Sequence, residues 1–110
     1  MLTWLVLTFV ATGLVFVGVS IPLIQRRIKP NYWYGFRVTK TLKNPEIWYD
    51  VNAYSGRWLL IMGIATVVVS VVLPLIPGMG LDTYALVTTT VISVLAIVMV
   101  VKSFLYLRKW

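Results

Sequence analysis

The hydrophobic residues form three long runs, which are separated by two polar segments of very different length. The first run covers residues 2–24, and the second and third cover residues 58–76 and 84–101. None of these runs contains a charged residue. Because about 20 helical residues span the ~30 Å hydrocarbon core of a bilayer, each run is long enough to cross a membrane. The pattern predicts an all-α integral membrane protein with three transmembrane helices, in one domain comprising residues 1–110.

The overall composition supports a membrane protein rather than a soluble one. The chain is 60% hydrophobic and only 12% charged, whereas roughly a quarter of the residues of a soluble domain are charged. A soluble domain of 110 residues could not bury so much apolar surface. The first run has no positively charged segment before it and is too long for a signal peptide, so we expect it to be a retained helix.

The longer polar segment, residues 25–57, contains a helix start. Asn44 is followed by proline and glutamate, which is a typical sequence for an N-cap and a first turn. We therefore expect a short amphipathic helix at about 45–55, lying on the membrane surface or on the helix bundle. A straight helix over 44–76 would be about 50 Å long, well beyond the bilayer core. A bend is therefore expected, and Gly56 is the best candidate for it.

Small residues recur every seven positions in the second run, at Gly56, Gly63 and Ser70. This spacing leaves one narrow helix face open to the close approach of another helix. Proline and glycine at 77–80 predict a tight turn before the third run. Asp82 is then expected to be the N-cap of the third helix.

The positive charges predict how the chain is oriented in the membrane. All ten Lys and Arg residues lie in the 25–57 segment or in the basic tail at 102–110. By the positive-inside rule, the N-terminus is outside, and the long loop and the C-terminus are cytoplasmic. The location expected is the inner (cytoplasmic) membrane of a cell. The basic residues favour anionic lipid headgroups as partners, and no nucleic-acid partner is expected.

Few residues offer catalytic chemistry. The chain has no cysteine and no histidine, and its only acidic residues are Glu46, Asp50 and Asp82. Known nucleotide-binding, metalloprotease and hydrolase motifs are absent. Glu46 and Asp50 are one helical turn apart, but two carboxylates alone are most simply a solvated face. We therefore expect no enzyme activity, no cofactor and no metal, and the uncharged spans argue against an ion pump.

A group of polar and aromatic residues in the long loop remains as the candidate site. Arg37 is followed by Thr41 and Asn44, and then by Trp48 and Asn52, which are one helical turn apart. Two interpretations are open. Arg37 folds back onto the helix that carries Trp48 and Asn52 as a structural clasp, or the same residues line a small polar pocket at the cytoplasmic mouth. The aromatic residues at 32–36 are either an interfacial belt or part of that pocket.

This loop resembles the signature of the SdpI family of small bacterial membrane proteins. The matching positions are Asn31, Tyr34, Gly35, Phe36, Arg37, Thr41, Leu42, Trp48, Asn52 and Gly56, with Gly63 in the second run. The chain departs from the pattern at Val38-Thr39, where the family often has Thr-Pro. The founding type of the family is about twice as long, with further helices before this module.

The resemblance implies a non-enzymatic protein that acts by binding. It implies immunity to a membrane-active peptide toxin, with a linked role in signalling to a cytoplasmic regulator. The binding residues implied are Asn31, Tyr34, Gly35, Arg37, Thr41, Asn44, Trp48 and Asn52. Two alternatives are kept. The chain could be a small accessory subunit that packs against other membrane subunits, or a small oligomeric transporter or channel.

Overall fold

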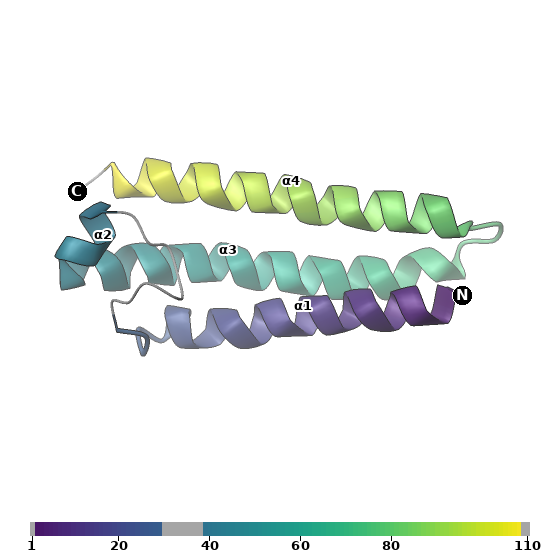
Figure 1. The fold of residues 1–110 in the computed structure, drawn as a ribbon, viewed down its shortest axis with the longest axis horizontal. Coiled ribbons are helices and arrows are strands. Elements are labelled where there is room, and N and C mark those ends of the chain that lie inside the picture. Colours follow the sequence, from purple (N-terminus) through teal and green to yellow (C-terminus); the bar gives the residue numbers. More distant parts are fainter. Residues whose placement is uncertain (1, 30–38, 109–110) are drawn as a thin grey trace.

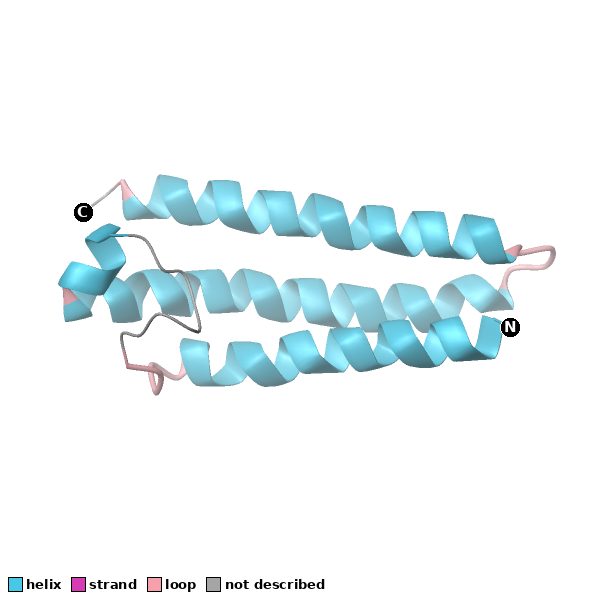
Figure 2. Ribbon diagram, in the orientation of Figure 1, coloured by secondary structure: helices cyan, strands magenta, loops and turns pink. Residues whose placement is uncertain are grey.

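The fold is entirely helical in the part of the chain that the structure describes. The computed structural model describes residues 2–29 and 39–108. The helices are α1 (Leu2–Ile24), α2 (Thr39–Lys43), α3 (Pro45–Val72) and α4 (Leu81–Leu107), and a short 3₁₀ turn, η1 (Leu73–Leu75), follows α3 (Figures 1 and 2). Three of these segments are long and apolar enough to cross a membrane, which confirms the predicted number of spans.

The three long helices form a bundle with α3 at its centre. α1 and α4 each run antiparallel to α3 and pack along it, whereas they make little contact with each other. Near the N-terminus of α1 they meet through Phe9 and Tyr84, whose rings lie edge to face with centroids 5.8 Å apart. We call the opposite end of the bundle, which holds Arg26, Lys43 and Arg108, the basic end (left in Figure 1).

α3 is one continuous helix, so the predicted bend at Gly56 and the separate surface helix at 45–55 are wrong. The helix has 28 residues and is about 42 Å long, which exceeds the hydrocarbon thickness. It continues straight because α1 lies against it at this level. A Cβ atom on Gly56 would lie 3.0 Å from the Cβ of Leu23 and 3.2 Å from the carbonyl oxygen of Ser20. Gly56 therefore allows close packing and does not break the helix.

The predicted close-approach face of α3 is confirmed at its two glycines. A Cβ on Gly63 would lie 2.8 Å from the carbonyl oxygen of Gly13 and 2.9 Å from the backbone nitrogen of Val17. Gly13 is the matching position on α1, which the sequence pattern did not reveal. Ser70 is fully buried, and its carbonyl oxygen accepts a hydrogen bond from the Tyr84 hydroxyl of α4 at 3.0 Å.

The turn between α3 and α4 occurs where the prolines and glycines predict it. Gly78 has a positive φ of 78°, and the amide of Met79 donates to the carbonyl of Ile76 at 3.3 Å. The N-cap of α4 is Gly80, so the prediction of Asp82 as the N-cap is wrong by two residues. Asp82 lies in the first turn, where its charge still interacts favourably with the helix dipole.

Candidate functional site at the basic end

The start of α3 positions the site residues, and the predicted N-cap is confirmed. The Asn44 side chain accepts a hydrogen bond from the backbone N–H of Glu46 at 3.0 Å, and Pro45 occupies the first helical position. Such a cap typically stabilises a helix by ~1 kcal/mol. It determines where α3 begins, and Trp48 and Asn52 lie in the first turns that follow.

Trp48 anchors the segment that follows α1. Its side chain is fully buried, and its indole Nε1–H donates a 2.7 Å hydrogen bond to the carbonyl oxygen of Ile28. Asn52 is buried one turn later, and its Nδ2 donates to the Trp48 carbonyl at 2.9 Å. Thr41 of α2 is also fully buried. The Trp48 hydrogen bond attaches the segment after α1 to the start of α3, and α2, which carries Thr41, also packs against α3.

The predicted site residues divide into two groups. Thr41, Asn44, Trp48 and Asn52 are described, and all four lie at or beside the start of α3. The remaining positions lie outside the described residues, which leaves the Arg37 clasp a prediction; these are Asn31, Tyr34, Gly35 and Arg37.

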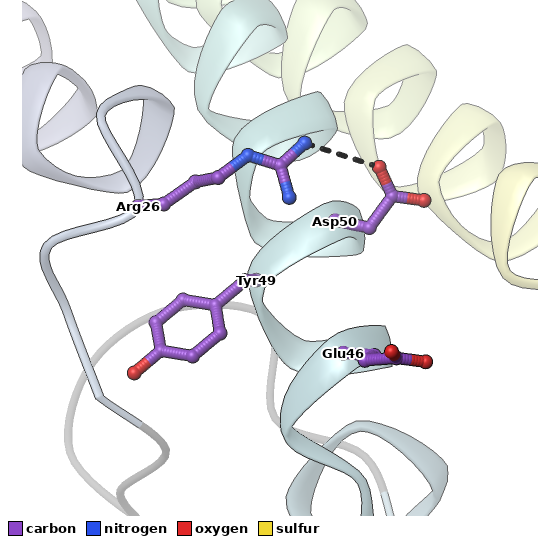
Figure 3. A pocket seen from close by; sticks show the side chains of 4 residues that line it. All are labelled: Arg26, Glu46, Tyr49 and Asp50. Carbon is purple, nitrogen blue, oxygen red and sulfur yellow. Dashed lines mark hydrogen bonds and ion pairs between the residues drawn. The ribbon is translucent and has the colours of Figure 1, made fainter.

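Asp50 joins the ends of all three long helices, although the sequence pattern indicated only a solvated face for it. The Tyr106 hydroxyl of α4 lies 2.8 Å from each of its carboxylate oxygens. From the end of α1, the Arg26 guanidinium lies 3.5 Å from Oδ1, as Figure 3 shows. The Asp50 side chain is 24% exposed. One carboxylate therefore connects α1, α3 and α4.

The backbone after α1 carries Arg26 towards Asp50. Arg26 has a φ of 60°, in the left-handed region that most residues avoid. Its N–H donates to Leu23, and that of Arg27 donates to Pro22, so α1 ends in a Schellman motif with arginine at the position where glycine is usual. The strained conformation turns the chain sharply, and the Arg26 side chain then lies over α3.

A small packed core stabilises the basic end. Ile47, Val51 and Leu107 are buried together. Tyr54 and Tyr106 stack with ring centroids 4.2 Å apart and an interplanar angle of 16°. Nearby, the buried hydroxyls of Ser55 and Ser103 form a 2.6 Å hydrogen bond between α3 and α4. The ends of α3 and α4 thus pack through apolar, aromatic and polar contacts together.

An open pocket of roughly 440 Å³ lies beside Asp50. It is lined by Arg26, Glu46, Tyr49 and Asp50, and Figure 3 shows the Tyr49 and Glu46 side chains pointing away from the Arg26–Asp50 contact. The lining offers two carboxylates, one guanidinium and a phenol, which suits polar binding. Arg26 and Tyr49 were not among the predicted site residues, because no spacing rule connects them to the loop motif.

The fold defines this protein as a multi-pass membrane protein whose three long helices are joined by a polar network at one end. It belongs to the SdpI/YfhL protein family, since residues 27–106 match the model of that family. The match includes Asp50, Tyr106 and all the described signature residues, but excludes α1 and Arg26. Searches of curated proteins and of solved structures gave no match to the chain.

Replacing Tyr106 with phenylalanine is expected to lower the free energy of unfolding by about 1–2 kcal/mol. The variant keeps the stack on Tyr54 but loses the hydroxyl that donates to the Asp50 carboxylate, and hydrogen bonds to charged groups are worth more than neutral ones. The measurement is thermal unfolding in a mild detergent. Tyr49→Phe is the matched control, because no hydrogen bond joins the Tyr49 hydroxyl to another described residue. Equal losses in both variants would contradict a role for the Tyr106–Asp50 contact.

Proposed function

We propose that this protein is a non-enzymatic immunity or signalling protein of a bacterial cytoplasmic membrane, acting by binding. In this proposal the basic end faces the cytoplasm and the N-terminus lies outside, as the positive-inside rule predicts. Membership of the SdpI/YfhL family supports the proposal, because that family is named for protection against a secreted peptide toxin.

The observation that carries the proposal is the hydrogen bond from Trp48 to the Ile28 carbonyl. It places a signature residue in direct contact with the segment that leads into the signature loop. Thr41 and Asn52, two further signature residues, are buried at the same end of the bundle. Buried signature residues that hold a loop at a helix end are a suitable support for a binding surface, since a preorganised surface loses less entropy on binding.

Binding at this end can protect a cell in two ways. A membrane-active peptide captured against the loop or the pocket beside Asp50 would be kept from assembling in the bilayer. Alternatively, occupation of the site would alter the cytoplasmic surface that a regulator recognises. Both require only non-covalent contacts.

The proposal is tested by deleting the gene and challenging the cells with the membrane-active peptides that their own population secretes. We expect the deletion strain to become sensitive, and a copy carrying Arg37→Ala to fail to restore protection while the protein stays abundant in the membrane. Arg108→Ala, which removes an equal charge from the end of α4, should restore protection fully. A deletion strain as resistant as its parent would overturn the proposal.

An accessory subunit of a larger membrane complex is the second candidate. It is favoured by the wide apolar surfaces of the outer helices, where Trp4, Leu86 and Ile97 are strongly exposed. The mass of the particle extracted in mild detergent distinguishes the accessory-subunit function from the immunity or signalling function. A particle with other subunits at fixed ratio supports the subunit function, and a particle of this chain alone supports binding of a peptide.

A further inference from the structure

One face of α3 is covered by neither of its neighbours. Arg57, Ile61, Ile64 and Val68 follow each other at steps of four, three and four residues, which places them on a single helical stripe. All four are exposed, and the three apolar side chains are 49%, 51% and 53% accessible. We call these four residues the α3 stripe.

The neighbouring helices use other faces of α3. α1 contacts the face that carries Gly63 and Val67, where a side chain on Gly13 would collide with Val67. α4 contacts the face that carries Ser55 and Ser70. The α3 stripe is therefore left open along the membrane-spanning part of the helix.

Arg57 lies at the depth of a lipid headgroup. The segment from Arg57 to Leu75, at the end of the candidate span, is about 27 Å long, close to the ~30 Å thickness of the hydrocarbon core. Trp58 follows directly, and tryptophan is enriched at the membrane–water boundary. The charge of Arg57 is thus at the boundary, and the three apolar residues of the stripe extend from it into the acyl region.

The positive charge of Arg57 is available to a ligand. The nearest carboxylate on this side of α3 is Asp50, which already accepts from the Tyr106 hydroxyl and lies beside Arg26. Arg57 forms no ion pair with any residue in the described ranges, 2–29 and 39–108. An exposed guanidinium can form paired hydrogen bonds with a phosphate group, more specifically than lysine can.

From these observations we infer that the α3 stripe is a binding site for one anionic phospholipid. Its phosphate contacts Arg57, and an acyl chain lies along Ile61, Ile64 and Val68. A partner helix fits this face less well, because membrane helix interfaces are enriched in small residues. Gly56 and Gly63 of α3 already pack against α1, and Ser55 already packs against α4. The inference requires only that the chain spans a bilayer, and it does not depend on the proposed function.

The test is a lipid titration of the delipidated full chain in mild detergent, followed by native mass spectrometry. The probes are phosphatidylglycerol and phosphatidylcholine with the same acyl chains. We expect phosphatidylglycerol to bind preferentially, with one molecule retained per chain. Arg57→Gln should weaken its binding about five-fold, the factor that corresponds to roughly 1 kcal/mol per cation at an anionic surface. Arg108→Gln removes an equal charge at the end of α4, which is not part of the α3 stripe. This variant should leave the affinity unchanged.

Two further probes separate a lipid from a free phosphate. A short-chain phosphatidylglycerol should bind more weakly than the long-chain form, because less acyl chain contacts the stripe. Inorganic phosphate should not displace the lipid. Equal affinities for both headgroups, equal affinities of the Arg57→Gln and Arg108→Gln proteins, or displacement by phosphate would each overturn the inference. Because Arg57 is exposed, its replacement leaves the packing of the bundle intact, and a single sharp elution peak checks this.

Discussion

Replacing Trp48 with alanine is expected to lower the free energy of unfolding by about 3–5 kcal/mol, the usual cost of removing a fully buried large aromatic side chain. The indole is 0% exposed, so its removal leaves a cavity at the basic end. The change also removes the hydrogen bond to the Ile28 carbonyl. We therefore expect the segment after α1 to separate from α3.

Chemical denaturation of the protein in detergent micelles measures this effect, and Trp4→Ala is the matched control. Trp4 is 76% exposed, so its removal should change stability little. Trp48→Phe keeps an aromatic ring but loses the indole donor and part of the buried volume, so its cost should lie below that of Trp48→Ala. The lost hydrogen bond to the partly buried Ile28 carbonyl alone should account for about 1 kcal/mol of that cost. If Trp48→Ala and Trp4→Ala unfold at the same denaturant concentration, Trp48 does not anchor the loop.

Gly63→Ala is expected to have the second largest effect, a loss of about 1–3 kcal/mol from overpacking between α1 and α3. The new methyl group would lie 2.8 Å from the carbonyl oxygen of Gly13 and from Cγ2 of Val17. The backbone atoms of α1 cannot move aside as a flexible side chain would, so the two helices must separate. Loosening this contact should also move the end of α1, and with it Arg26, away from Asp50.

Gly18→Ala is the control for Gly63→Ala, since a Cβ at position 18 meets nothing within 4 Å. Alanine has the higher helix propensity, by up to about 1 kcal/mol, so this variant should be neutral or more stable. Thermal unfolding of both variants in the same detergent compares their stabilities. A Gly63→Ala protein as stable as the Gly18→Ala protein would show that α1 and α3 do not pack closely at this position.

The Trp48→Ala and Gly63→Ala variants test different kinds of contact, and only the helix contact of Gly63 was predictable from the sequence. Gly63 was expected to face another helix, because small residues recur every seven positions in the second hydrophobic run. Its partner Gly13 was not predicted, since a glycine in an apolar run carries no signal of what it faces. Trp48 was a candidate from its place in the loop motif, but its acceptor, a backbone carbonyl, has no sequence signature.

The residues that connect the helices were the least predictable part of the site. Asp50 and Tyr106 are 56 positions apart in the sequence, and Ser55 and Ser103 are 48 apart. Such pairs depend on how far α4 is shifted along α3, which no local pattern of residues specifies. Asp50 therefore looked like part of a solvated face, although it is the point at which three helices meet.

The sequence alone determined the features that depend on local composition. Three uncharged runs of sufficient length required three spans, because lipid accepts neither charges nor unpaired backbone groups. Asn44 followed by proline determined where α3 begins, because capping is a contact between near neighbours in the chain. Tertiary structure decided that α3 stays continuous past Gly56 and that Asp50 meets Arg26 and Tyr106. Both results follow from the packing of α1 and α4 against α3, whose energy comes from contacts between residues distant in the chain.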